Sequence, residues 1–214
     1  VNGDVDFRYN YLESLEGCPE IVEGGFYCNN NYLKALKDAP KKIDGSFYCN
    51  NNNLETLEGS PEVINGDFYC DKNKLISLKG SPKKINGKFS CSMNELISLV
   101  DCPQEIKQDL LLHENKLKSL KGCPEIIYGD LNLSSNELES LENGPKEIKG
   151  GLYISRNKSI SLKGMPNKIA ECLYSQNNSL TLNELEYLPE TIITNYISIK
   201  NNPELKNFKE ISDF

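Results

Sequence analysis

Hydrophobic and polar positions recur along this chain with a fixed period of 21 residues. One unit reads GDFYCDKNKLISLKGSPKKI, in which Phe68 and Cys70 stand on either side of a tyrosine. This alternation has the period of two that is typical of a short strand, so we expect both side chains to point inward. Leu75, Leu78 and Ile85 would complete the core on the turns and the return path. The pattern therefore predicts one short strand per repeat, joined by mostly non-helical connections.

The residues that form the turns between the strands recur with the same regularity. Prolines mark eight units, at Pro19, Pro40, Pro61, Pro82, Pro103, Pro124, Pro145 and Pro166. Asparagines mark ten units, at Asn10, Asn31, Asn52, Asn73, Asn94, Asn115, Asn136, Asn157, Asn178 and Asn201 or Asn202. The position two before each proline holds only residues that tolerate a positive φ, namely Gly17, Asp38, Gly59, Gly80, Asp101, Gly122, Asn143 and Gly164. We expect the asparagines to form a ladder that bonds backbone groups at the bend after each strand.

A unit of this size cannot bury its apolar side alone, so consecutive units must stack into a repeat solenoid. We expect about nine repeats over residues 1–192, and a last irregular repeat with a C-terminal cap over residues 193–214. Phe208, Ile211 and Phe214 would cover that end. At the other end Val5 and Phe7 would be half exposed. Either the first residues fold over this end or another chain covers it, so a homodimer through the uncapped N-terminal end is a hypothesis.

The spacing F-x-C-x-x-N-x-L resembles the core L-x-L-x-x-N-x-L of the leucine-rich repeat family. The resemblance covers nearly the whole chain, and the short unit with its proline is similar to bacterial leucine-rich repeats of type III secreted effectors. Similar repeats occur in bacterial and tailed-phage proteins. The resemblance implies a curved parallel sheet with short strands on the concave side and a mostly non-helical convex side. One departure is an Ile-x-Gly element between proline and strand, as in Ile43-Asp44-Gly45.

The eight cysteines stand where other repeats have small or apolar residues. The inward strand position holds Cys28, Cys49, Cys70 and Cys91, and the position before proline holds Cys18, Cys102 and Cys123. We therefore expect reduced thiols in the core, with no disulfide, metal or other cofactor. Cys172 precedes an inward leucine and is expected to be more exposed. Free thiols and the lack of a visible signal peptide or apolar span predict a location in the host or bacterial cytoplasm.

Charge limits the classes of partner. A net charge of −7 disfavours nucleic acid, which needs a basic stripe. The residue before each turn glycine alternates in sign along Glu16, Lys37, Glu58, Lys79, Val100, Lys121, Glu142 and Lys163. The residue after proline begins in the same way, with Glu20, Lys41, Glu62 and Lys83. Adjacent turns would therefore pair opposite charges, which points to a structural face.

The outward strand positions are the surface left for function. The central one reads Asp6, Tyr27, Tyr48, Tyr69, Ser90, Leu111, Asn132, Tyr153 and Tyr174. Stacked tyrosines on a concave face are typical of a binding surface, although they also favour strand packing. The flanking columns are most charged and varied in repeats four to six. The candidate partner-binding residues are Tyr27, Tyr48, Asp67, Tyr69, Asp71, Lys72, Lys88, Met93, Asp109, Leu111, His113, Glu114, Tyr153 and Tyr174.

Catalysis is not expected from this pattern. His113 is the only histidine, with Asp109 and Glu114 near it and Ser92 and Ser134 one repeat to either side. A Ser–His–Asp arrangement can be drawn from these residues, but a flat sheet offers no oxyanion donors or closed pocket.

The sequence thus predicts a non-catalytic module that binds a partner protein through its concave face, with no membrane or cofactor. The resemblance adds a setting, a phage or bacterial modulator of a host protein such as a defence factor. Two alternatives stay open: a protein that binds or sequesters a small ligand or nucleotide, and a surface adhesin of the internalin type.

Overall fold

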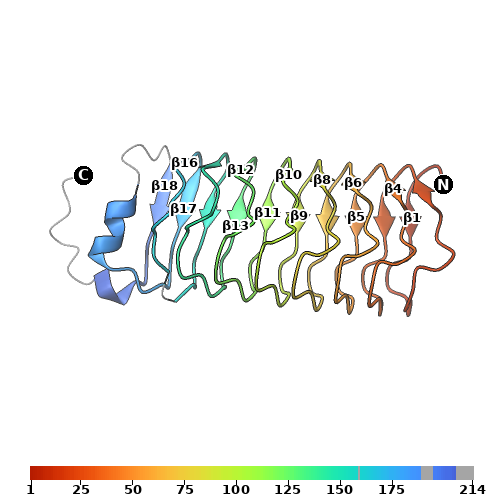
Figure 1. Ribbon diagram of the computed structural model, residues 1–214, viewed down its shortest axis with the longest axis horizontal. Coiled ribbons are helices and arrows are strands. Elements are labelled where there is room, and N and C mark those ends of the chain that lie inside the picture. Colours follow the sequence, from red (N-terminus) through yellow and green to blue (C-terminus); the bar gives the residue numbers. More distant parts are fainter. Residues whose placement is uncertain (159, 189–194, 206–214) are drawn as a thin grey trace.

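Successive turns of about 21 residues stack side by side into a parallel β-solenoid (Figure 1). The computed structural model describes residues 1–158, 160–188 and 195–205. Each turn contributes one strand to a continuous ten-stranded parallel sheet, called here the concave sheet. Its strands are β1 (Val5–Asp6), β3 (Phe26–Tyr27), β5 (Phe47–Tyr48), β7 (Phe68–Tyr69), β9 (Phe89–Ser90), β11 (Leu110–Leu111), β13 (Leu131–Asn132), β15 (Leu152–Tyr153), β17 (Cys172–Tyr174) and β18 (Tyr196–Ser198).

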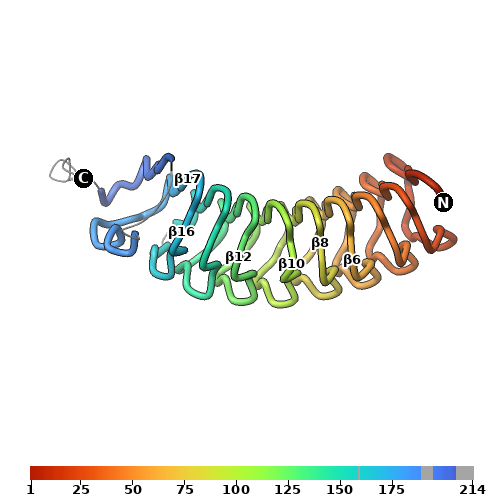
Figure 2. Tube along the Cα trace, turned by 90° about the horizontal axis from the view of Figure 1, so that it is seen from above, coloured from red at the N-terminus to blue at the C-terminus, as the bar shows by residue number. Residues whose placement is uncertain are grey.

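The stack of turns is curved, and Figure 2 shows β17 on its concave side with β16 away from it. Because β17 belongs to the ten-stranded sheet, that sheet follows the concave side, as predicted. Equivalent residues face each other without any offset: Phe26 pairs with Phe47, and Phe47 pairs with Phe68. Every outward side chain therefore lies directly beside its counterpart on the next turn.

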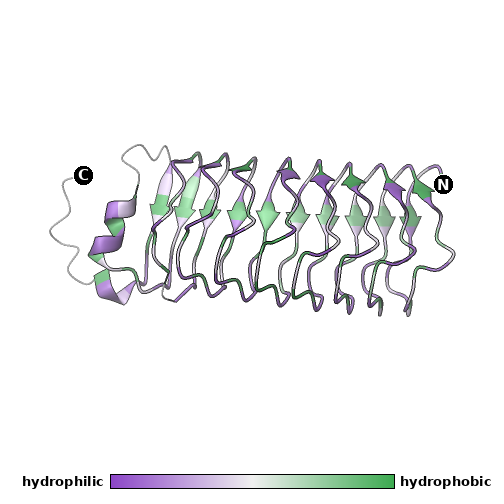
Figure 3. Ribbon diagram, in the orientation of Figure 1, coloured by the Kyte–Doolittle hydropathy of each residue, from purple (hydrophilic) through white to green (hydrophobic). Residues whose placement is uncertain are grey.

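A second set of strands, called here the second sheet, runs along the Ile-x-Gly elements and was missed by the sequence reading. Five strands form one part, β2 (Ile21–Val22), β4 (Lys42–Ile43), β6 (Val63–Ile64), β8 (Lys84–Ile85) and β10 (Glu105–Ile106). Three form the other, β12 (Ile126–Ile127), β14 (Glu147–Ile148) and β16 (Lys168–Ile169). Their outward residue is apolar in β2, β6 and β12 and charged in β4, β8, β10, β14 and β16, and Figure 3 shows both colours along this sheet.

Glycines allow the turns to approach closely beside this second sheet. A Cβ at Gly87 would lie 2.7 Å from the carbonyl carbon of Gly66. Gln108 and Glu171 stand where six other turns have Gly24, Gly45, Gly66, Gly87, Gly129 and Gly150. The second sheet is divided near Gln108, since β10 and β12 belong to different parts.

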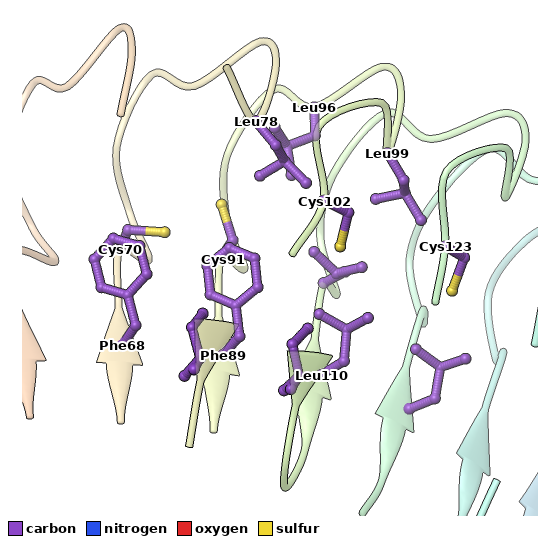
Figure 4. Packing of buried hydrophobic residues seen from close by; sticks show 14 of the residues in the cluster. Phe68, Cys70, Leu78, Phe89, Cys91, Leu96, Leu99, Cys102, Leu110 and Cys123 are labelled. Atoms are coloured by element: carbon purple, nitrogen blue, oxygen red, sulfur yellow. The ribbon is translucent and has the colours of Figure 1, made fainter. Parts of the chain in front are cut away.

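The core is a set of parallel columns inside the coil. The inward strand residues change from Phe and Cys in the N-terminal half to Leu in the C-terminal half, and Figure 4 shows the junction from Phe68 and Phe89 to Leu110. Phe47, Phe68 and Phe89 are fully buried, with ring centroids 5.3 and 5.5 Å apart. Cys28, Cys49, Cys70 and Cys91 are also fully buried, as predicted.

Two bends with positive φ close each turn. The position two before proline has a positive φ in all eight units, from Gly17 (83°) and Asp38 (66°) to Gly164 (86°), which confirms the prediction. The residue before each ladder asparagine also has a positive φ, between 52° and 61°, although glycine never occurs there. This second bend turns the chain away from the concave sheet.

The ends differ from the regular turns. Val5 is buried, with 8% of its surface exposed, so the prediction that it would be half exposed was wrong. The reason is that residues 1–3 follow the next turn, where Glu23 N donates to Val1 O and Gly24 N donates to Gly3 O. Phe7 is half-buried against Phe26, as predicted. Phe208, Ile211 and Phe214 of the expected cap lie outside the described residues.

Two 3₁₀ helices precede and follow β18 in the chain, η1 (Leu182–Tyr187) and η2 (Pro203–Leu205). Over the ranges that the structure describes, no helix has the length and hydropathy to cross a membrane.

Candidate partner-binding surface

The outward tyrosines form two stacks on the concave sheet. Tyr27, Tyr48 and Tyr69 lie on successive turns, with ring centroids 5.2 and 4.7 Å apart. Tyr153 and Tyr174 form the second pair, 5.2 Å apart and nearly parallel. All five side chains are half-buried, so each remains partly open to solvent. Between the stacks lie Ser90, Leu111 and Asn132, of which Ser90 is buried.

Each stack is extended at its outer end by a residue that the sequence reading did not include. The Arg8 guanidinium lies 5.2 Å from the centre of the Tyr27 ring, at the N-terminal end. It is held by two bonds to Asp6, from Nε to Oδ1 at 2.9 Å and from Nη2 to Oδ2 at 2.6 Å. Tyr196 lies 5.5 Å from Tyr174 at the other end. Tyr196 was missed because its backbone pairs with Cys172, in the column beside the tyrosines, and because the spacing before β18 is longer.

Burial changes the acidity of these tyrosines. Partial burial is the main cause that raises the pKa of Tyr48 and of Tyr69, with nearby Asp67 adding to the effect. For Tyr153 the main cause is its hydrogen bond with Cys172, whose Sγ lies 3.5 Å from the phenol oxygen, and this contact raises the pKa of Tyr153. All three hydroxyls are therefore neutral at physiological pH and can both donate and accept hydrogen bonds.

The acidic column at the start of the strands has a structural role in addition to any contact with a partner. Asp67 Oδ1 accepts a bond from Lys88 N at 2.8 Å, and Asp109 Oδ1 accepts one from Asp130 N at 2.9 Å. Lys88 Nζ also pairs with Asp109 Oδ2 at 2.8 Å. Each carboxylate thus ties its turn to the next one. The spacing of the sequence placed these residues on the concave face but did not reveal these backbone bonds.

The other predicted residues divide between the sheet and its rim. Asp71 and His113 lie in the column beside the tyrosines, and Leu111 lies in the gap between the two stacks. Lys72, Met93 and Glu114 are exposed at the bend after the strand, where each has a positive φ. They therefore lie at the edge of the surface rather than on its floor.

The serine and histidine side chains do not form a catalytic triad. Ser92 Oγ lies 2.9 Å from His113 Nδ1, but Ser92 is only 2% exposed, so its oxygen is not open to a substrate. Asp109, the acid that such a triad would use, accepts a hydrogen bond from Asp130 N and forms an ion pair with Lys88. Asp71 Oδ1 accepts bonds from Ser90 Oγ and from Ser92 N. In a catalytic triad the carboxylate contacts the histidine, and the histidine contacts the serine nucleophile. Here the carboxylate of Asp71 contacts the serines instead, and Ser92 contacts His113.

No protein-family model matches the chain, and no curated protein matches it. The architecture, a parallel repeat solenoid with turns of about 21 residues, comes from the structure alone.

The cysteines lie apart from this surface, with one exception. All eight are free thiols, and six of them are buried. Burial raises the pKa of the Cys123 thiol to about 12 and holds those of Cys28 and Cys49 above the ordinary value. Cys172 is the exception, half-buried beside Tyr153 on the concave sheet. In the part of the chain that the structure describes, no group of three or more His, Cys, Asp or Glu side chains could hold a metal ion.

Proposed function

We propose that this chain is a non-catalytic module that binds a partner protein through the concave sheet. The observation that carries the proposal is the pair of tyrosine stacks, Tyr27 to Tyr69 and Tyr153 to Tyr196, on one continuous face. Stacked rings are already ordered before binding, so a partner gains contact area without a large loss of side-chain entropy. Rigid aromatic side chains with hydroxyl groups are the residues most often found at interface hot spots.

We also propose that the repeats are leucine-rich repeats. Support comes from the ladder asparagines, of which Asn73 is an example: it follows its strand and bonds backbone groups of its own and the preceding turn. In the phage or bacterial setting that the resemblance implies, the partner would be a cytoplasmic host protein. A defence factor is one such partner.

A variant pair tests the use of the concave sheet. Purified protein would capture partners from a lysate of the native host, and Tyr48→Ala/Tyr69→Ala would be compared with Tyr128→Ala/Tyr187→Ala. The control residues are exposed tyrosines outside the concave sheet. We expect the concave variant to lose a partner that the wild type and the control both retain. A partner retained by all three proteins would contradict the proposal.

A second variant separates folding from recognition. Tyr48→Phe/Tyr69→Phe keeps the stacked rings, spaced 4.7 Å, and removes only the hydroxyl groups. Circular dichroism melts of all variants would show whether the solenoid is intact. Loss of the partner in a variant that melts like the wild type places the effect on contact rather than on folding.

A further inference from the structure

Two amide carbonyl groups without donors lie beside the first tyrosine stack. Asn29 and Asn50 follow Tyr27 and Tyr48 by two residues, so they share the outward face of their strands. Asn29 is only 8% exposed, and the Oδ1 atoms of Asn29 and Asn50 are buried with no donor among the described groups. A buried carbonyl without a donor loses its water bonds without replacement. Because these oxygens are buried, a partner reaches them only after a half-turn about χ2, which exchanges the oxygen and the nitrogen of each amide.

Asp71 continues this row on the next turn. Its Oδ1 accepts bonds from Ser90 Oγ and from Ser92 N. Within the described part of the chain no donor is recorded at its Oδ2. Adjacent turns are about 4.8 Å apart. Asn29, Asn50 and Asp71 therefore form a line of three acceptors, called here the acceptor row, parallel to Tyr27, Tyr48 and Tyr69.

The charge of the concave sheet favours a cation at this row. Asp6 pairs with Arg8, and Asp109 pairs with Lys88. The remaining carboxylates of the outward columns, Asp4, Asp67, Asp71 and Asp130, have no ion pair in the described residues. A surface with this excess of negative charge attracts a basic partner and repels an acidic one.

The chain itself shows how a guanidinium group fits such a surface. Arg8 covers the Tyr27 ring at 5.2 Å and binds both oxygens of Asp6. A tyrosine ring and a carboxylate on the same face are the two parts of that contact. Tyr69 and Asp71 also place a ring and a carboxylate on the outward face, two turns beyond Tyr27, with the carboxylate on the same turn as its tyrosine rather than on the preceding one.

We propose that the acceptor row and the first tyrosine stack recognise arginine side chains of the partner protein, an inference that rests on the proposed function and specifies its partner. Arginine fits better than lysine because its planar fork donates to two acceptors at once and packs against aromatic rings. Asn29 and Asn50 accept from one guanidinium, and Asp71 Oδ2 accepts from the same group or the next one.

A defined peptide tests this chemistry without the natural partner. The probe is a fluorescein-labelled peptide of alternating serine and arginine with four arginines, and its binding is followed by anisotropy at physiological salt. Matched peptides carry lysine or citrulline, the uncharged isostere of arginine, in place of arginine. We expect the arginine peptide to bind at least about fivefold more tightly than the lysine peptide, and the citrulline peptide to bind weakest.

Variants then locate the contact. Asp71→Asn should weaken the binding of the arginine peptide at least about tenfold, because the substitution removes a charge-assisted hydrogen bond. Asn50→Leu should weaken it without changing the net charge. Asp101→Asn is the control, since it makes the same charge change on an exposed turn outside the concave sheet, and it should leave the affinity within about twofold.

Three results would overturn the inference: equal binding of the lysine and arginine peptides, an equal loss in Asp71→Asn and Asp101→Asn, or no binding of the arginine peptide. None of these results bears on whether the concave sheet binds a protein. A partner that is lost in Tyr48→Ala/Tyr69→Ala but retained in Asp71→Asn would leave the proposed function standing and remove the arginine chemistry.

Discussion

At the scale of single residues, the ladder asparagines do the most to join one turn to the next. Asn94 Oδ1 accepts a bond from Leu75 N on the preceding turn at 3.1 Å. Its Nδ2 donates to Cys70 O on the preceding turn and to Cys91 O on its own. One buried amide thus satisfies three backbone groups at the bend. An aspartate or a leucine of similar size could not provide both the donor and the acceptor.

Replacement of one ladder asparagine should destabilise the solenoid. Asn94→Ala leaves Leu75 N and two carbonyl groups without partners in a buried site, so we expect a loss of about 1–3 kcal/mol in the free energy of unfolding. Asn53→Ala is the control, because Asn53 is half-buried outside the ladder, and it should change the free energy by less than about 0.5 kcal/mol. Urea unfolding followed by circular dichroism measures both. Equal losses in the two variants would rule out a special role for the ladder.

At the scale of one turn, the tight bend before each proline decides how closely neighbouring turns pack. Gly80 has a φ of 84°, and a Cβ there would lie 2.3 Å from Glu58 N of the preceding turn. Asp38, Asp101 and Asn143 adopt the same left-handed conformation in other turns. A side chain is therefore tolerated only where the neighbouring turn leaves space for it.

Two glycine variants separate backbone strain from steric clash. Gly17 has almost the same φ, 83°, but nothing lies within 4 Å of a Cβ placed there. Gly17→Ala should therefore lower the free energy of unfolding by about 1–2 kcal/mol, which is the strain of a left-handed alanine alone. Gly80→Ala should lower the free energy of unfolding by about 1–3 kcal/mol more than Gly17→Ala does, because the clash with Glu58 forces the turns apart. Thermal and urea unfolding of the two variants measure the difference in their stability. Similar losses in both would show that neighbouring turns move apart at little energetic cost.

The turn also shows how much of the fold and of the surface could be read from the sequence. The strand, the asparagine ladder and the bend before proline follow from residue types with strict local requirements, and the tyrosine stacks follow from the parallel register. The second sheet could not be read, because only one inward residue in each of its strands, such as Ile64, leaves a pattern. The bend at Lys72 and Met93 was hidden because no glycine marks it. The bonds from Asp67 and Asp109 to the next turn depend on side-chain direction, which spacing does not give.

At the scale of the whole molecule, ion pairs between turns run along the outer surface. Lys41 pairs with Glu20 at 2.7 Å, and Lys83 pairs with Glu62 at 2.7 Å, as the alternating signs predicted. Lys79 pairs with Glu58, and Lys163 pairs with Glu142, in the column before the turn glycine. These pairs are largely exposed, so each contributes little, but their number makes the stability of the stack depend on pH and salt.

The stability of the solenoid should fall at both extremes of pH. The pKa of Asp6 is lowered to about 2 by its bonds to Arg8, and those of Glu20 and Glu95 are lowered by Lys41 and Lys116. Carboxylates of this kind stabilise the fold above their unfolded pKa of about 4, and the contribution disappears as the pH falls through the lowered value.

The lysines behave in the opposite sense. Glu58 and Glu142 raise the pKa values of Lys79 and Lys163, so their stabilisation is complete below about pH 10 and disappears as the pH rises through the raised values. We expect a plateau in melting temperature between about pH 5 and 9, with a decrease on either side that high salt reduces. Circular dichroism melts from acid to alkaline pH test this, and a melting temperature that stays constant below pH 4 would contradict it.

The alternating signs restrict how the gene for this chain can change in length. Removal of a single turn, for example the one with Lys37 and Lys41, would place Glu16 beside Glu58 and Glu20 beside Glu62. Removal of two consecutive turns, for example those with Lys37 and Glu58, would place Glu16 beside Lys79 and Glu20 beside Lys83, so opposite charges stay adjacent there. Over these first four turns we therefore expect duplications and deletions of 42 residues to cost less stability than those of 21, so that the step by which this part of the chain changes length is two turns.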